Sequence, residues 1–279
     1  MRINKSILYV NYAPYGNTGQ ILDYLNERYR KVYVIIFNFH KTSLSESSLS
    51  VYINGKLNDN RKLFNFVVPS NLVFFLLPIR SFINLLQIFY HTLRLRQQFG
   101  KIDIYFSVNA FTTWAGNVLK GFKIVNKTVF WVWDYYPPVH ESKVITFMRQ
   151  IYWHFDRLAS YSDHVVFVNH RLQDLRKNMG IIPDDAKFDV VSIGTQTPLV
   201  HRGHHYILGF VGVLKRGQGL DMVFKNSALI KKQFKKVKLE IIGTGPDAKY
   251  YKQLANSCHI PINFHGHLND PEYSNILKT

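Results

Sequence analysis

Residues 207–221 read ILGFVGVLKRGQGLD. The first five form an apolar run that is typical of a buried strand, and a helix begins near Leu220. Between the two lies a loop with glycines and two neighbouring cations. The backbone amides of such a loop, together with Lys215 and Arg216, are suited to neutralise a diphosphate where the helix begins. The alternative interpretation is an exposed loop whose cations are simply solvated.

The same alternation of strand, loop and helix extends along the chain. The predicted strands are residues 7–11, 32–37, 102–107, 128–133, 165–168, 207–211, 237–242 and 262–265. The predicted helices are residues 21–29, 112–119, 148–159, 171–179, 220–234 and 246–256, with a last one beginning near Asp270. Strands that are apolar along their whole length and are separated by helices indicate a parallel sheet covered on both faces.

A stretch without apolar periodicity interrupts this pattern at residues 194–206. We therefore predict an α/β protein of two Rossmann-like, doubly wound parallel-sheet domains, formed by residues 1–195 and 207–279 and joined by a linker at residues 196–206. The second domain has few predicted strands, and the sequence stops inside an apparent helix at Ile276. We expect this second domain to be incomplete and the chain to be truncated at its C-terminus.

Composition narrows the choice of partners. The 279 residues carry 35 Lys and Arg against 18 Asp and Glu, a formal charge of +17. Nucleic acid, an anionic membrane surface and a phosphorylated substrate all suit such a charge. No nucleic acid is expected, because the sequence has no zinc-finger spacing, ribonucleoprotein motif or basic region before heptads. The single cysteine, Cys258, excludes a disulfide scaffold, and no signal sequence is recognised, so we expect a cytoplasmic protein.

The most apolar part of the sequence is Leu63–Tyr90. It contains Pro78 and Arg80, and a membrane-spanning helix needs about 20 uninterrupted apolar residues, so we do not expect a span. Two interpretations remain. An apolar, aromatic helix with the basic flank Arg94 and Arg96 suits the surface of an anionic bilayer, which would make the protein peripheral to the membrane. The alternative is a helix buried against a sheet.

Three further turns follow predicted strands. They are residues 11–19, with Gly16 and Asn17; residues 242–247, with Gly243 and Gly245; and residues 263–270, with Gly266, His267 and Leu268. Ligands bind open parallel sheets at the carboxyl ends of the strands, where such turns lie. Each turn taken alone is also consistent with a plain connection between a strand and a helix.

The order of these turns resembles that of the retaining nucleotide-sugar glycosyltransferases of the GT-B fold, the large family four group. The segments that carry the resemblance are Gly212-Val213-Leu214, Gln218-Gly219-Leu220-Asp221, Gly243-Thr244-Gly245-Pro246 and Phe264-His265-Gly266. In that family they correspond to Gly-Arg-Leu, Lys-Gly before an acidic helix residue, Gly-x-Gly-Pro and Phe-x-Gly. The resemblance implies a nucleotide-sugar site formed by Gly212, Gln218, Gly219, Gly243, Gly245, Gly266, His267 and Leu268.

The resemblance extends into the first domain. Residues 129–137, VFWVWDYYP, are similar to the family segment that lines the acceptor side. This implies an acceptor contact at Asp134, with Gly16 and Asn17 in an acceptor-side loop. The family's histidine before the Asp is replaced by Trp133. Residues 190–194 resemble the family's closing strand before the linker.

Two departures from the family pattern bear on catalysis. The family's diphosphate-binding Arg and Lys fall on Val213 and Gln218, which carry no positive charge. Transfer builds negative charge on the leaving diphosphate, so we expect Lys215 and Arg216 to take over its stabilisation. The family also has two glutamates, eight positions apart, downstream of its Phe-x-Gly strand. The sequence ends before them, and we expect that the chain as given does not complete catalysis by itself.

These features predict a retaining hexosyltransferase of polysaccharide biosynthesis. It would move a sugar from a nucleoside-diphosphate sugar to a cell-surface glycan or a lipid-linked acceptor at the inner face of the cell membrane. The alternative is a non-catalytic glycosyltransferase-like subunit or an inactive fragment. No cofactor and no metal are expected. The histidines that invite a metal lack carboxylates or cysteines at ligand spacing; they are His201, His204, His205, His265 and His267.

Overall fold

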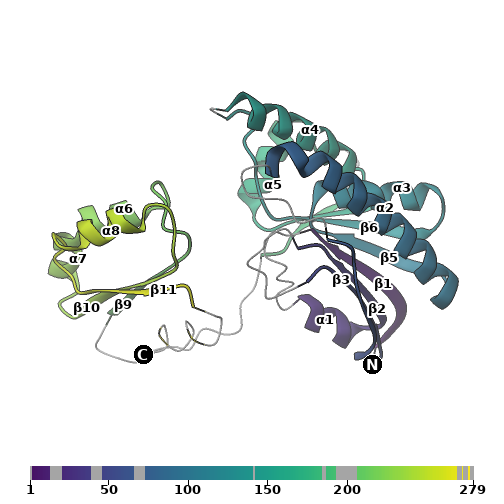
Figure 1. The fold of residues 1–279 in the computed structure, drawn as a ribbon, viewed down its shortest axis with the longest axis horizontal. Helices are drawn as coiled ribbons and strands as arrows, with labels where there is room; N and C mark the ends of the chain where they lie inside the picture. Colours follow the sequence, from purple (N-terminus) through teal and green to yellow (C-terminus); the bar gives the residue numbers. More distant parts are fainter. Residues whose placement is uncertain are drawn as a thin grey trace. The chain divides into compact units, whose positions relative to one another are not determined.

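The computed structural model describes residues 2–12, 21–38, 46–65, 73–140, 142–183, 187–192 and 206–268, with Glu272 and Ile276, and gives residues 73–75 as backbone only. The chain divides into two compact units, residues 1–195 and 196–279, called here the first and the second unit (Figure 1). Each is built around its own sheet.

The first unit holds an eight-stranded sheet in its described part, in the order β4-β3-β2-β1-β5-β6-β7-β8. The strands are β1 Ile3–Asn11, β2 Tyr29–Ile36, β3 Ser48–Ile53, β4 Lys56–Lys62, β5 Ile102–Ser107, β6 Val125–Val132, β7 His164–Phe167 and β8 Phe188–Val190. Six neighbouring strands of this sheet run parallel, as their apolar sequences predict; they are β2, β1, β5, β6, β7 and β8. The closing strand was expected at residues 190–194; the structure has β8 at Phe188–Val190, the backbone N–H of Val191 still donates to the carbonyl of Phe167 at 2.8 Å, and residues 193–194 lie outside the described residues.

An antiparallel hairpin of β3 and β4 extends the sheet beyond β2, and the sequence analysis did not predict it. Its turn is Asn54-Gly55, with φ of 53° and 79°. Two positive φ values in a two-residue loop are what an Asn-Gly hairpin turn requires, so a local signal was present. Strand β4 escaped notice because its sequence, KLNDNRK, is polar and mostly exposed at the edge of the sheet.

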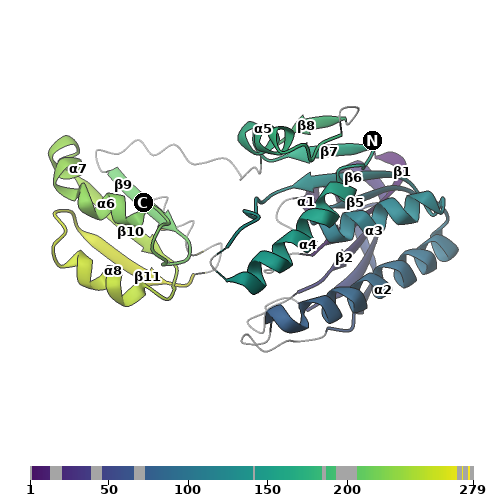
Figure 2. The same ribbon diagram turned by 90° about the horizontal axis from the view of Figure 1, so that it is seen from above.

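Helices cover both faces of this sheet. They are α1 Ile21–Arg28, α2 Val73–Phe99, α3 Ala110–Gly121, α4 Lys143–Ala159 and α5 His170–Asn178. Among them α1 packs on one face, and α2 to α5 lie on the other (Figures 1 and 2). The side chains of Asn109 and Asn169 accept hydrogen bonds from the first backbone amides of α3 and α5, which marks where these helices begin.

Helix α2 settles part of the question raised by the apolar stretch Leu63–Tyr90. Its buried side, which includes Leu85, Ile88 and Leu95, packs into the core of the sheet, so the interpretation as a buried helix is confirmed for that side. Its other side is exposed. None of the described helices is long and apolar enough to cross a membrane.

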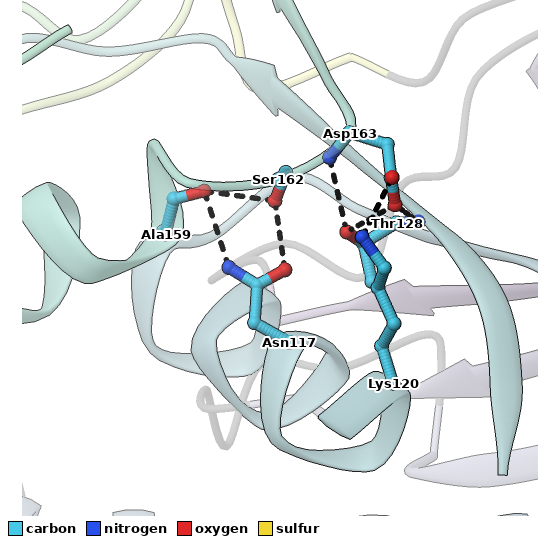
Figure 3. A network of polar contacts seen from close by, with 6 residues as sticks. All are labelled: Asn117, Lys120, Thr128, Ala159, Ser162 and Asp163. Carbon is cyan, nitrogen blue, oxygen red and sulfur yellow. Dashed lines mark hydrogen bonds and ion pairs between the residues drawn. The ribbon is translucent and has the colours of Figure 1, made fainter. Parts of the chain in front are cut away.

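A polar network joins α3, β6 and the turn between α4 and β7 (Figure 3). The Nζ of Lys120 lies 2.6 Å from the carboxylate of Asp163, which also accepts the backbone N–H of Thr128 at 2.8 Å. Beside it, the hydroxyl of Ser162 donates to the Oδ1 of Asn117 at 3.1 Å. A cavity of about 410 Å³ opens next to this network, at the amino ends of β6 and β7. This is the edge opposite to the one where parallel sheets bind ligands.

Asp163 makes the stability of the first unit depend on pH. Burial raises the pKa of Asp163, but hydrogen bonds from Lys120 and Thr128 outweigh burial and leave this pKa below its usual value. A carboxyl group with a lowered pKa stabilises the fold above its unfolded pKa of about 4, and this stabilisation is lost as the pH falls through the folded pKa. We expect the free energies of unfolding of wild type and Asp163→Asn to converge as the pH falls from about 5 to below the folded pKa of Asp163. Urea unfolding at each pH measures this, and a constant difference would contradict it.

The second unit has a parallel sheet of three strands in its described part, in the order β11-β10-β9. Its elements are β9 Tyr206–Val211, α6 Leu220–Lys225, α7 Ser227–Gln233, β10 Val237–Ile242, α8 Ala248–Ala255 and β11 Ile262–Gly266. The three helices pack on one face of this sheet (Figure 1). The helix predicted near Asp270 lies outside the described residues.

The single helix predicted over residues 220–234 is wrong, because the structure breaks it at Asn226 into α6 and α7. The side-chain amide of Asn226 donates to the carbonyl of Met222 at 2.8 Å. An Asn side chain competes in this way with the helical backbone, and Ser227 after it is also a weak helix former.

Candidate functional site

The three strands of the second unit end side by side. Ile242, at the end of β10, is paired with Val211 of β9 and with Gly266 of β11. The loops that follow these strands therefore begin at one edge of the sheet, which is the edge where open parallel sheets bind ligands. All the residues that the sequence analysis assigned to the nucleotide-sugar site, from Gly212 to Leu268, lie in these loops or at the ends of the strands.

Two glycines lock these loops together. A Cβ on Gly243 would lie 1.9 Å from the carbonyl oxygen of Gly212, and one on Gly245 would lie 2.4 Å from the carbonyl oxygen of Leu214. The same segments exchange backbone hydrogen bonds, from Leu214 to Thr244 and from Asp247 to Leu214, both at 3.0 Å. Gly243 and Gly245 are thus needed for the close approach of two backbones.

Asp221, the acidic helix residue of the motif, is linked through hydrogen bonds to the loop that carries Lys215. Its carboxylate accepts hydrogen bonds from the hydroxyls of Tyr251 at 2.8 Å and Tyr250 at 3.3 Å. The hydroxyl of Tyr251 also lies 3.3 Å from the carbonyl oxygen of Lys215. The hydrogen bond from Tyr251 lowers the pKa of Asp221, so this acceptor stays ionised. The sequence analysis missed both tyrosines; their one signal was an adjacent aromatic pair on the predicted helix 246–256.

The two cations of the loop differ in their surroundings. Arg216 is held by its own unit: its backbone N–H donates to Asp247 at 2.9 Å, its Nε lies 3.7 Å from the same carboxylate, and its Cζ lies 4.0 Å from the centre of the Tyr250 ring. Lys215 is exposed, and its ammonium group forms no ion pair with the described residues. Lys215 is therefore the cation that remains available for an anionic ligand.

The remaining motif positions are exposed at the same edge. Val213 is 51% exposed, and Gln218 and His267 are exposed as well. Gly217 and Gly219 have φ of 84° and 87°, so the loop uses left-handed conformations that glycine adopts without strain. Val213 and Gln218 thus leave these two exposed positions without positive charge.

One ring nitrogen of His265 is engaged by a carboxylate of its own unit. Its Nε2 lies 2.6 Å from the carboxylate of Glu240, which also contacts the Nζ of Lys238 at 3.0 Å and the Nδ2 of Asn263 at 3.0 Å. Over the described ranges, no group of three or more His, Cys, Asp or Glu is arranged to hold a metal ion. His201, His204 and His205 lie outside those ranges.

In the first unit, Asp134 follows β6 and is exposed. It accepts a hydrogen bond from the hydroxyl of Tyr136 at 3.3 Å, and burial together with the charge of Asp134 raises the pKa of Tyr136 to about 12. The loop is fastened to α4, because Trp153 donates to the carbonyl of Tyr136 at 2.9 Å and Arg149 donates to that of Pro137 at 2.8 Å. Asp134 is thus presented on an anchored loop.

The aromatic pair at the end of β6 has unused hydrogen-bond donors. The rings of Trp131 and Trp133 meet edge to face, with centroids 5.4 Å apart. Neither indole N–H has a hydrogen-bond partner within the described part of the chain. Gly16 and Asn17, assigned to the same side by the sequence analysis, lie outside the described residues.

Comparison with known proteins agrees with this picture. A family model described as glycosyl transferases group 1 matches residues 196–279. No curated protein matches the sequence. The sucrose-phosphate synthase of Thermosynechococcus elongatus has a similar structure, with a TM-score of 0.62 and 13% identity over 97% of this chain and 72% of that chain.

Two other solved structures are similar. The catalytic domain of starch synthase IV from Arabidopsis thaliana, described as bound to ADP and acarbose, has a TM-score of 0.59 and 11% identity over 98% of this chain and 76% of that chain. The lipopolysaccharide outer core galactosyltransferase WaaB has a TM-score of 0.53 and 15% identity over 96% of this chain and 70% of that chain. The resemblance carried by the glycine turns is confirmed, and the fold is GT-B.

Proposed function

We propose that this protein, which has the GT-B fold and matches the glycosyl transferases group 1 family over residues 196–279, is a glycosyltransferase that takes its sugar from a nucleoside-diphosphate donor. The acceptor is a cell-surface glycan or a lipid-linked sugar at the inner face of the cell membrane. The transferred sugar is a hexose, and its anomeric configuration is retained.

One observation carries the proposal: the turns after β9 and β10 are interlocked at the carboxyl edge of the second sheet. Gly243 and Gly245 leave no space for a side chain against the loop that begins at Gly212. The loop is therefore held in one shape, with its backbone amides and Lys215 at the edge where ligands bind. A preformed loop of this kind suits a diphosphate, whose charge is met without reorganisation of the protein.

We assign to Lys215 the role of binding the diphosphate. Arg216 mainly fixes the shape of the loop, since Asp247 and Tyr250 already hold Arg216. We expect Lys215→Ala to weaken the binding of UDP or ADP about 10-fold, the equivalent of about 1.4 kcal/mol, a usual size for a charge-assisted hydrogen bond. We expect a smaller loss for Arg216→Ala. Isothermal titration calorimetry on the full chain measures both.

Lys235→Ala is the matched control, because Lys235 is an exposed lysine between α7 and β10, at the opposite edge of the sheet. It should leave nucleotide binding unchanged. Equal losses in Lys215→Ala and Lys235→Ala would mean that only overall charge matters, and the assignment of Lys215 would fail. Absence of binding to any nucleoside diphosphate by the wild type would overturn the proposed function.

A second candidate is a glycosyltransferase-like subunit that binds a nucleotide without turning it over. It is favoured by Val213 and Gln218, which stand uncharged at the edge of the site. The two candidates differ in one measurement. Release of nucleoside diphosphate from a nucleotide sugar by the full-length gene product supports the enzyme, whereas nucleotide binding by that product without such release supports the subunit.

A further inference from the structure

We propose that the exposed sides of α2 and α4 form a docking face for the surface of an anionic lipid bilayer. The face is defined by Ile79, Phe82, Leu86, Tyr90 and Leu93 of α2 and by Val144, Phe147 and Ile151 of α4. It deepens the proposed function by stating where a lipid-linked acceptor would be met, and in that respect rests on it. The observations themselves concern the first unit alone.

The apolar side chains of α2 follow one side of the helix. Their spacing of three and four residues repeats over four turns, which aligns them in a stripe. All five are 49–60% exposed, with Phe82 the most exposed. Single exposed apolar residues are ordinary, but a continuous stripe of large ones marks an interaction surface. The buried side of the same helix is already satisfied by the sheet.

Helix α4 carries a second apolar stripe. Val144, Phe147 and Ile151 are spaced by three and four residues and are 38–61% exposed. Both helices lie on one face of the sheet and bury their other sides toward it or toward α3 (Figure 2). Their exposed sides therefore both look away from the sheet. Val139, in the loop before α4, is 73% exposed and adds to the apolar surface.

The two helices expose positive but no negative side chains, which favours an anionic partner. No Asp or Glu occurs between Asp59 and Asp103, so α2 has no carboxylate at all. The only carboxylate of α4, Asp156, is buried in an ion pair with Arg176 of α5. Exposed cations border both stripes; they are Arg94, Arg96, Lys143 and Arg157.

An apolar face with a basic border, on two helices that expose no carboxylate, suits anionic headgroups above acyl chains. A second copy of the chain is a poorer occupant, because it would bring two faces of the same positive sign together, and like charges facing each other cost several kcal/mol. The chemistry therefore favours a lipid surface.

Co-sedimentation of the full chain with vesicles tests the proposal. Vesicles of phosphatidylcholine with about 30% phosphatidylglycerol should bind the protein, and vesicles of phosphatidylcholine alone should bind it at least 10-fold more weakly, since each basic residue near an anionic surface contributes about 1 kcal/mol. Phe82→Asp combined with Leu86→Asp should lower the partition coefficient at least 10-fold and leave UDP binding unchanged. Nucleotide binding thus reports separately on the proposed function.

The matched control is Leu57→Asp combined with Leu229→Asp, which adds the same charge at two exposed leucines outside the docking face. A second test keeps the stripes intact: Arg94→Gln with Lys143→Gln should weaken binding to anionic vesicles about 10-fold and leave the weak binding to neutral vesicles unchanged. No binding to anionic vesicles would overturn the proposal. Equal losses in the control and in the stripe variant, or self-association of the wild type that the stripe variant abolishes, would overturn it as well.

Discussion

Replacing Arg176 by methionine is expected to lower the free energy of unfolding of the first unit by about 3–5 kcal/mol, the usual cost of removing one partner of a buried ion pair. Arg176 of α5 and Asp156 of α4 form such a pair, with exposed side-chain fractions of 2% and 0%. The guanidinium also donates to the hydroxyl of Ser160 at 3.1 Å and lies 5.8 Å from the centre of the Phe130 ring.

The reason for so large an effect is the carboxylate that stays behind. Burial raises the pKa of Asp156, because the interior disfavours its ionised form. Without Arg176 this group must either remain charged among apolar residues or take up a proton, and both cost free energy. Asp156→Leu combined with Arg176→Met leaves no buried charge, so we expect the double variant to recover most of the loss.

Urea unfolding followed by circular dichroism measures these free energies. Arg171→Met is the matched control, because Arg171 is an exposed arginine in the first turn of the same helix and should cost less than about 0.5 kcal/mol. A loss below about 1 kcal/mol for Arg176→Met, or a double variant less stable than Arg176→Met, would show that the pair is not what joins α4 to α5.

Gly245→Ala is expected to weaken nucleotide binding by the second unit at least 10-fold, about 1.4 kcal/mol or more. The added methyl would lie 2.4–2.7 Å from three backbone atoms of Leu214. Backbone atoms do not rotate away as a side chain does, so the loop that carries Lys215 has to shift. Overpacking of this kind also costs about 1–3 kcal/mol of stability, which gives a second measurement that is independent of the proposed function.

Calorimetry with UDP and thermal unfolding together separate the two effects. Gly121→Ala serves as control, since a Cβ at Gly121 meets no atom within 4 Å and this glycine has no positive φ. It should leave nucleotide binding unchanged and should not lower the unfolding temperature, because Gly→Ala at such a position stabilises by about 0.4–1 kcal/mol. A Gly245→Ala variant that binds UDP as the wild type does would contradict the role of the interlocked turns.

Much of the fold was predictable because its signals are local. Residues 102–107 and 237–242 form strands with the predicted bounds, since a short apolar run between turns already indicates a buried strand. The failures came from elements whose state depends on neighbours. Strand β4 is polar and exists because β3 pairs with it, and the break at Asn226 depends on one side-chain hydrogen bond that competes with the helix.

In the candidate site too, some residues could be found from the sequence and others depend on contacts with distant residues. Gly243 and Gly245 were found because their turn resembles a known family segment, and the structure adds the reason for glycine there, which is the close approach of two backbones. Tyr250 and Tyr251 were missed, since their role is set by Asp221, which lies 29 and 30 residues away along the chain. Periodicity places them on a helix but does not say which group their hydroxyls reach.

The sequence by itself determined the class of fold and most of the alternation of strands and helices, because these depend on residues close to one another in the chain, and its glycine turns carried the resemblance to nucleotide-sugar enzymes. Only the tertiary structure decided that Asp247 holds Arg216 while Lys215 stays available, and that α2 exposes one apolar side. Both depend on which distant side chains the fold brings into contact, and hydrophobic periodicity carries no information about that.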